Sequence, residues 1–275
     1  HGGSLETAKE LITASAWAGA DYAKFQARTP KLCVPEDQWD TPKLTPWGET
    51  MPYIDYRHRM EFGLRDMIEL TRHADREGIK LFLSVWDLPS LELATQLSYD
   101  YVKIPSAKIT DLGLVKATAE YCGKAGKGFM MSTGMSTEAE IDEAVGVAIV
   151  PRRADGATLT VMHCNSSYPA VTEELNLAMI LTMREWWGED ITIGYSGHEL
   201  GIAPTIWAVV LGAALVERHI TLNQRAVGSD HAASLEPLAF GKMVRQVHSV
   251  GIALGDGVKR VYDSELPARA KLRGG

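Results

Sequence analysis

Two histidines stand at matching places in the sequence, each shortly after a β-type run of residues. His198 follows the run 191–195 and His219 follows the run 214–217, with an apolar helical stretch between them. In a chain of alternating strands and helices, this spacing places both imidazoles at the C-terminal ends of neighbouring parallel strands, where α/β barrels carry their chemistry. With Asp230 close behind, two neutral imidazoles would form a divalent-metal site with open positions. Each histidine alone could be structural, in an exposed loop or in the core, but the pair favours a metal site.

Polar side chains suited to an anionic substrate lie in or after the other expected strands. Lys24 and Lys103 each lie inside an apolar run, where an ammonium group needs an anionic partner unless its side chain reaches solvent. Two such lysines with a ring of serines would hold a phosphate and a carboxylate. Each serine alone could instead cap a helix or close a turn. The polar residues near strand ends are Gln26, Ser106, Ser132, Asn165, Ser166, Tyr168 and Ser196.

Acidic residues also stand near these strand ends. Glu199 follows His198 and Glu217 precedes His219, and Asp87 follows an earlier strand. Carboxylates beside metal-binding histidines commonly orient the imidazole rings. Glu199 and Glu217 are equally compatible with charges at a helix start or at the rim of the sheet.

The elements that position these residues alternate along the chain. Seven short apolar runs alternate with eight amphipathic segments, which is typical of a parallel sheet covered by helices. We predict a (β/α)8 TIM barrel that forms a single catalytic domain over residues 1–275, with its first strand missing from the N-terminus. An open doubly wound sheet is less favoured, because no Gly-rich dinucleotide fingerprint follows a strand. The expected strands are 22–26, 80–84, 101–104, 128–132, 159–163, 191–195 and 214–217, and the expected helices are 5–18, 60–77, 90–97, 112–122, 138–148, 175–187, 202–211 and 237–254.

Composition narrows the class of protein. A length of 275 residues, with 45% hydrophobic residues, suits one large α/β domain. The net charge of −7 argues against a nucleic-acid surface, and no apolar run reaches the roughly 18 residues of a membrane helix. The three cysteines are too few for a disulfide framework and favour a reducing cytoplasm, with Cys164 interpreted as a small buried residue. Residues 27–59, rich in Pro, Trp and charge, form the longest irregular region, which is typical of a functional lid.

Motifs through nearly the whole chain carry a family resemblance. YSGHELGIA, ERHITL and GSDHAASLEP surround the two histidines, and HGGSLETAKELI, AGADYAKFQ, YVKIPSA, FMMSTGMSTEAEIDEAV and HCNSSYP precede them in order. The sequence resembles the sialic acid synthase family, which condenses phosphoenolpyruvate with an open-chain aldose to give a 3-deoxy-2-keto sugar acid and phosphate. The resemblance implies a homodimer in which each C-terminal antifreeze-like domain covers the partner's site. Because the chain stops at Gly275, we expect that domain to be absent and the segment 27–59 to cover the site instead.

The resemblance also assigns roles to single residues. It implies that His198 and His219 hold a divalent ion, Mn²⁺ or Mg²⁺ or also Co²⁺, and that both act in catalysis with Lys24, Lys103 and Asp230. It places Gln26, Tyr168 and Asp230 near the acceptor sugar, with Asn165 in the same substrate-binding group. The positions that match those holding phosphoenolpyruvate are Lys24, Lys103, Ser106, Ser132, Ser166 and Ser196.

One position departs from the family pattern. Where the family has an acidic residue that contacts the sugar hydroxyls, this chain has Lys108. Lysine only donates hydrogen bonds, so we expect Lys108 to bind the acceptor differently and to favour an anionic sugar. Three alternatives stay open at this stage: a metal-dependent pyruvate aldolase, a synthase of another deoxy-keto acid, and a catalytically silent paralogue that binds a metabolite.

Overall fold

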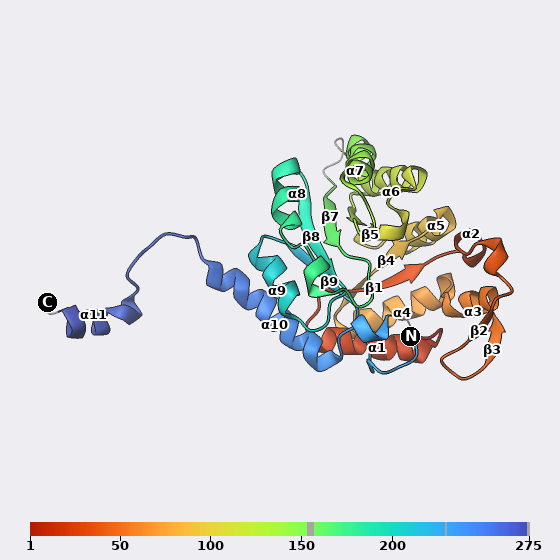
Figure 1. Cartoon of the computed structure of the whole chain (residues 1–275), viewed down its shortest axis with the longest axis horizontal. Coiled ribbons are helices and arrows are strands. Elements are labelled where there is room, and N and C mark those ends of the chain that lie inside the picture. Colours follow the sequence, from red (N-terminus) through yellow and green to blue (C-terminus); the bar gives the residue numbers. More distant parts are fainter. Residues whose placement is uncertain (153–156, 229, 274–275) are drawn as a thin grey trace.

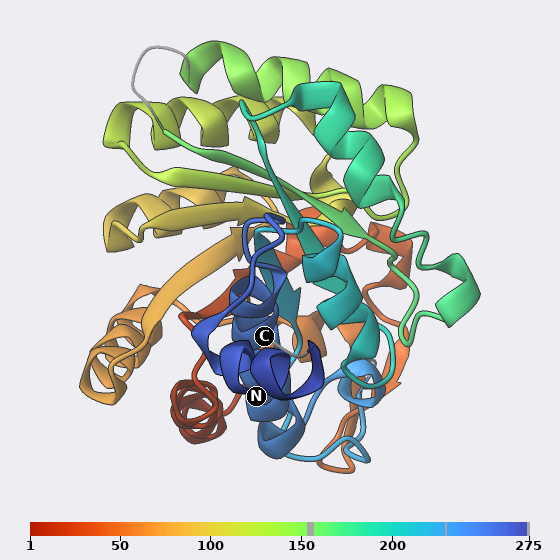
Figure 2. The same ribbon diagram turned by 90° about the vertical axis from the view of Figure 1, so that its left-hand side faces the viewer.

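The computed structural model describes residues 1–152, 157–228 and 230–273. Within them, seven parallel strands form one curved sheet in the order β1-β4-β5-β6-β7-β8-β9, with helices packed outside it (Figures 1 and 2). The predicted α/β, TIM-barrel-like fold is confirmed, with one strand fewer than a closed eight-stranded barrel. The strands are β1 (Tyr22–Ala27), β4 (Lys80–Val85), β5 (Tyr101–Ile104), β6 (Gly128–Ser132), β7 (Leu159–Cys164), β8 (Thr192–Gly197) and β9 (Leu215–Arg218).

The helices follow the predicted amphipathic segments, and local capping sets several of their ends. Asp87 accepts a hydrogen bond from the backbone N–H of Ser90 at 2.8 Å and so begins the helix after β4. Gly78 ends the preceding helix in the left-handed conformation, where glycine is unstrained. The helices are α1 (Leu5–Trp17), α4 (Leu64–Glu77), α5 (Leu88–Leu97), α6 (Leu112–Ala125), α7 (Glu138–Arg152), α8 (Met179–Trp187), α9 (Ala203–Val210), α10 (Pro237–Leu254) and α11 (Leu266–Arg273).

The segment 27–59 was predicted to be irregular, and this prediction is wrong. It contains helix α2 (Pro30–Cys33), a 3-10 turn, the hairpin β2 (Pro42–Leu44) with β3 (Thr50–Pro52), and helix α3 (Tyr53–Met60). The segment is held together by specific contacts, which cannot be predicted from a periodic pattern of apolar residues. The Trp39 indole N–H donates to the Val34 carbonyl at 3.0 Å, and Thr45 bonds to Glu49 across the hairpin turn.

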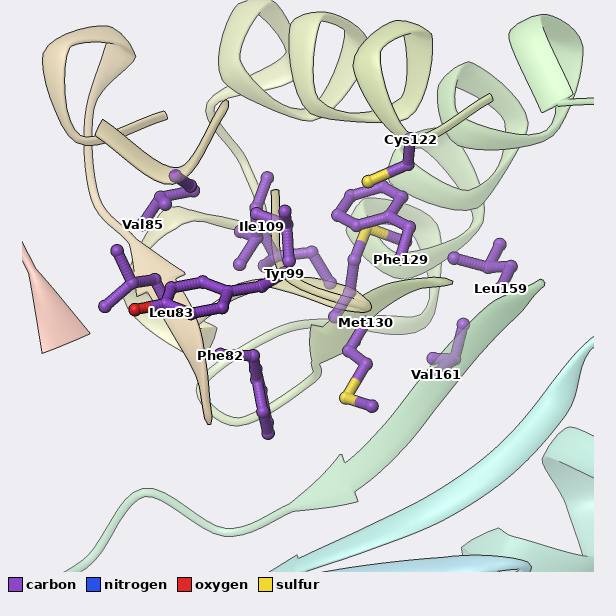
Figure 3. Close-up of a cluster of buried hydrophobic side chains, with 14 of the residues drawn as sticks. Phe82, Leu83, Val85, Tyr99, Ile109, Cys122, Phe129, Met130, Leu159 and Val161 are labelled. Carbon is purple, nitrogen blue, oxygen red and sulfur yellow. The ribbon is translucent and has the colours of Figure 1, made fainter. Parts of the chain in front are cut away.

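The main hydrophobic core lies between the sheet and the helices that cover it (Figure 3). Side chains such as Leu83, Ile109, Phe129 and Leu159 are essentially excluded from water. Burying one such side chain stabilises the fold by about 1.5–3 kcal/mol. This core fixes the strands, and therefore the residues at their C-terminal ends.

The C-terminal part of the chain makes few contacts with the barrel. After α10 the chain extends away from the body, and α11 lies apart from the sheet (Figure 1). Its side chains are exposed. Among the described residues, no helix combines the length and apolar character needed to cross a membrane.

Candidate functional site

The strands bring their polar side chains together at one end of the sheet. Because side chains alternate along a strand, residues two apart share a face. Gln26 of β1 lies opposite Ser84 of β4, and Ser84 lies opposite Lys103 of β5. On the far side of the sheet, Ser196 of β8 lies opposite Glu217 of β9. Ser84 was missed at the sequence level, although its register with Gln26 and Lys103 follows from the alternation.

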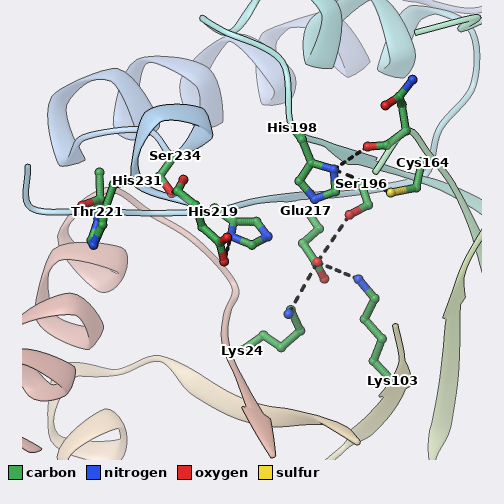
Figure 4. A network of polar contacts seen from close by, with 12 residues as sticks. Lys24, Lys103, Cys164, Ser196, His198, Glu217, His219, Thr221, His231 and Ser234 are labelled. Carbon is green, nitrogen blue, oxygen red and sulfur yellow. Dashed lines mark hydrogen bonds and ion pairs between the residues drawn. The ribbon is translucent and has the colours of Figure 1, made fainter. Parts of the chain in front are cut away.

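Two of the predicted lysines converge on a single carboxylate (Figure 4). The Lys103 ammonium lies 2.6 Å and the Lys24 ammonium 3.6 Å from the same oxygen of Glu217, and the Ser196 hydroxyl donates to that oxygen at 3.4 Å. Burial would raise the pKa of the Glu217 carboxyl, but the two lysines outweigh burial and hold that pKa far below its usual range. Glu217 is therefore a permanent counterion, and it contacts the lysines rather than a histidine ring.

A set of serines surrounds Gly134, just after β6. The backbone N–H of Gly134 donates to the Ser106 hydroxyl at 3.0 Å. A Cβ at Gly134 would overlap the Ser166 hydroxyl and lie 2.9 Å from that of Ser106, so only glycine allows the two serines to approach. The Ser132 hydroxyl is buried and has no hydrogen-bond partner among the described residues. The hydroxyls of Ser106 and Ser166 beside Gly134, with the unpartnered hydroxyl of Ser132 at the end of β6, suit an oxyanion.

The two histidines lie side by side at the ends of β8 and β9. Their ring centroids are 5.2 Å apart, and the Tyr168 ring lies 4.1 Å from that of His198. His198 Nδ1 lies 2.6 Å from the backbone carbonyl of Asn165. A carbonyl only accepts, so Nδ1 carries the proton and Nε2 keeps its lone pair for a ligand. The Asn165 side chain is turned into its own loop, where its amide donates to the Glu174 carbonyl.

His219 completes the pair and suits a metal ligand. Burial and the positive charges of Lys24 and His198 lower the pKa of His219, so its imidazole is neutral near pH 7. The carboxylate of Asp230 lies 3.9 Å from His219 Nδ1. Within the described residues, no three His, Cys, Asp or Glu side chains gather into a closed metal site. Two imidazoles with further positions open, neutral once the pH is above the raised pKa of His198, therefore fit a divalent ion that also accepts oxygen ligands from substrate or water.

A buried ion pair fixes the backbone beside both histidines. Arg218 precedes His219 and points to the opposite face of β9, where it donates to Glu199 Oε1 at 2.8 Å and to the Glu199 carbonyl at 2.6 Å. Glu199 also accepts from Tyr195 at 2.9 Å and from Thr205 of α9 at 2.8 Å. The Arg218 side chain is 0% exposed and that of Glu199 1%. Arg218 was missed at the sequence level, because its partner Glu199 follows the neighbouring strand β8, 19 residues away in the chain.

Lys108 lies on the opposite side of the site from the histidines. It belongs to the 3-10 turn Ser106–Lys108 that follows β5, and it is partly buried. Asp87 follows β4 nearby and accepts from the Thr29 backbone and from the Cys33 thiol. The segment 27–59 thus contacts this side of the barrel mouth, and its role as a lid stays a prediction.

Comparison with known proteins identifies relatives of this chain. A model of the NeuB family matches residues 11–259. N,N'-diacetyllegionaminic acid synthase of Campylobacter jejuni is 35% identical over 96% of this chain and 78% of its own length. N-acetylneuraminate-9-phosphate synthase of Homo sapiens is 33% identical over 99% of this chain and 73% of its own length. The structure of the N-acetylneuraminic acid synthetase from Leptospira borgpetersenii, in complex with citrate, superposes with a TM-score of 0.82 at 27% identity, over 100% of this chain and 90% of that one.

The family match covers the segments that carry the lysines, serines and histidines of the site. It extends over most of the chain, and the relatives are matched over about three quarters of their length. The predicted family is confirmed. The chain belongs to the NeuB family of phosphoenolpyruvate-condensing sugar-acid synthases.

Proposed function

We propose that this protein joins phosphoenolpyruvate to an open-chain aldose at the end of the sheet where its lysines and histidines meet. The observation that supports this assignment best is the pair of lysines beside two adjacent imidazoles. An anion-binding cluster next to a cation-binding pair suits a reaction between a phosphorylated enol and an aldehyde.

The chain's own groups have separate tasks in this reaction. Lys24 and Lys103 neutralise the phosphate and carboxylate of phosphoenolpyruvate, with Glu217 balancing the excess positive charge. Ser106, Ser132 and Ser166 orient the donor by hydrogen bonds. His198 and His219 would hold a divalent ion, which would supply Lewis acidity toward the aldehyde; NeuB-family enzymes generally use such an ion.

The condensation forms one carbon–carbon bond and breaks the bond between phosphoenolpyruvate and its phosphate. C3 of phosphoenolpyruvate forms a bond to the aldehyde carbon, and the aldehyde oxygen takes up a proton. Water adds to C2 and loses a proton, which leaves a hydroxyl group on C2. That hydroxyl loses its proton as the C–O bond to phosphate breaks, so the C2 ketone forms and the leaving phosphate takes up the proton. The products are inorganic phosphate and a 3-deoxy-2-keto acid lengthened by three carbons. Positioning both reactants can lower the barrier by about 7–11 kcal/mol.

Phosphate release tests the proposal. Purified protein is incubated with phosphoenolpyruvate, a panel of aldoses, and Mn²⁺, Mg²⁺ or Co²⁺, with metal-free and aldose-free controls. We expect phosphate only when both aldose and ion are present. Turnover with pyruvate in place of phosphoenolpyruvate would indicate an aldolase. Donor binding without release would indicate a silent paralogue. The expected homodimer stays a prediction, which sedimentation analysis of the purified chain checks.

A further inference from the structure

A second group of cations lies on the β1–β4–β5 side of the barrel mouth, apart from the lysines that hold the donor. Arg28 directly follows β1, Arg57 lies on α3, and Lys108 follows β5. The Arg28 guanidinium stacks 4.6 Å from the centre of the Trp86 ring, after β4. Arg57 lies 5.9 Å from the Tyr53 ring. Because β1, β4 and β5 are neighbours in the sheet, these cations share one sector of the mouth.

The acidic residues nearby do not balance these cations. Glu61 is occupied by Arg28, whose Nε lies 2.8 Å from one carboxylate oxygen and whose backbone N–H donates to the other at 3.1 Å. Asp87 accepts hydrogen bonds from Thr29, Ser90 and Cys33, which are neutral, so it keeps its negative charge and the three cations still exceed the two carboxylates. Neither Arg57 nor Lys108 forms an ion pair within 4.0 Å of any described carboxylate. Partly buried cations without counterions attract an anion from solution.

Unused hydrogen-bond donors lie in the same sector. Arg57 Nε and Trp86 Nε1 are both buried, and neither has a hydrogen-bond partner among the described residues. Buried donors without a partner are costly and are usually satisfied by protein, water or ligand. A phosphate offers several acceptor oxygens and suits two guanidinium groups and an ammonium group.

The sector also adjoins the acceptor side of the proposed reaction. Burial raises the pKa of Tyr56, on α3. The negative charge of Asp230 raises this pKa further and the positive charge of Arg28 lowers it, so both charges act on Tyr56. Asp230 is 3.9 Å from His219. An aldose whose reactive end lies at the imidazoles can therefore extend along Tyr56 toward Arg28 and Arg57.

We propose that Arg28, Arg57 and Lys108 form an anion subsite for the acceptor, so that this enzyme prefers an aldose that carries a phosphate group distant from its aldehyde. The proposal rests on the proposed function, since it assigns the acceptor class of the same site. The acidic residue that the resemblance leads one to expect at Lys108 would repel such a group.

Acceptor kinetics test the subsite. N-acetylmannosamine and its 6-phosphate are compared as acceptors at saturating phosphoenolpyruvate and Mn²⁺. We expect a higher kcat/KM for the phosphorylated sugar. Arg57→Gln and Lys108→Gln should each raise the KM for the phosphorylated sugar roughly tenfold, the effect of losing one charge-assisted contact, while the KM for phosphoenolpyruvate stays constant. Lys116→Gln, which removes an exposed lysine on α6, is the matched control and should change neither.

Direct binding separates this inference from the proposed function. Calorimetry with N-acetylmannosamine 6-phosphate, at saturating phosphoenolpyruvate and without added metal, needs no turnover. The subsite is supported, even if no phosphate is released, when Arg57→Gln weakens the binding of this sugar and Lys116→Gln leaves it unchanged. The subsite is overturned if the wild-type protein does not bind this sugar, if Arg57→Gln binds it equally well, or if the neutral sugar is the better acceptor. Phosphate release with no aldose present would contradict the proposed function alone.

Discussion

At the β8–β9 side of the barrel mouth, buried polar groups have partners; at the β1–β6 side, several do not. Glu199 accepts from Tyr195, Thr205 and Arg218, and these bonds tie the strand ends to α9. Across the mouth, polar atoms are buried with no described partner on Ser84, Trp86, Ser132 and Arg57.

The difference separates scaffold from binding surface. A satisfied polar network inside a protein is rigid and specifies one arrangement, which a pair of metal ligands requires. Unsatisfied buried donors are tolerated where a ligand completes them. The histidines therefore lie on the rigid side, and the substrates are expected to bind mostly against the other. One atom departs from this division: Arg218 Nε is buried without a described partner, although its terminal nitrogens make four hydrogen bonds.

Breaking the rigid side should have the largest effect. Arg218→Met leaves the Glu199 carboxylate buried without its cation, and we expect a loss of about 3–5 kcal/mol in the free energy of unfolding. Denaturant unfolding measures it. The double variant Arg218→Met with Glu199→Gln removes both charges and should recover part of the loss. If the single variant unfolds like wild type, the ion pair does not support the strand ends.

Removing either of the proposed metal ligands should affect binding rather than folding. His198→Ala and His219→Ala should each weaken the affinity for Mn²⁺ more than about 100-fold, since changes to groups that merely orient ligands already cost 10–100-fold. Calorimetry measures the affinity, and thermal unfolding without metal serves as the control. His163→Ala is a matched comparison, because His163 is buried and bonded to the Leu175 carbonyl away from the pair. Unchanged affinity in both His198 and His219 variants would rule out the site.

A smaller effect is expected where the substrate binds. Lys103→Met removes one charge-assisted contact to phosphoenolpyruvate, about 1.5–3 kcal/mol, and should weaken donor binding roughly tenfold or more. Lys80→Met is the control, because Lys80 forms an exposed ion pair with Asp100, and such pairs contribute about 0–1 kcal/mol. Donor affinity is read from the quenching of intrinsic fluorescence. Wild-type affinity in Lys103→Met would contradict the assignment.

The sequence predicted where the two histidines lie better than it predicted which residues pair across long distances in the chain. The positions of His198 and His219 follow from the alternation of strands and helices, because strand ends of a parallel sheet share one edge. The partners of Glu217 do not follow from local pattern: Lys103 is 114 residues away in the chain. Strand alternation does place Glu217 on the face of His219 and Arg218 on the opposite one, which was a usable signal.

The segment 27–59 shows where local pattern fails. Its short elements contain no long period, and its hairpin turn at Pro46 and Trp47 lacks the Asn-Gly or Asp-Gly pair that marks such turns. The contacts that order it, such as Arg59 over the Trp47 ring at 4.2 Å, join residues far apart in that segment. Arg28 and Arg57 were overlooked for the same reason, since only this packing brings α3 against α2, which follows β1.

The pH dependence of metal binding gives the smallest and most specific effect, because the two histidines differ. Burial lowers the pKa of His198, but Cys164, the Asn165 carbonyl and Glu217 outweigh it, so this pKa is raised above its ordinary value of about 6.5. The pKa of His219 is lowered. An imidazole must be neutral to bind a metal, so protons compete at His198 as the pH falls through its raised pKa, while His219 stays neutral. One competing proton reduces the affinity at most tenfold per pH unit.

Calorimetry with Mn²⁺ from pH 8 to pH 5.5 measures the slope, and Cys164→Ala should move the fall in affinity to lower pH by removing the group that raises the His198 pKa. A slope near 100-fold per unit would show that both histidines titrate together and that the asymmetry between them is wrong.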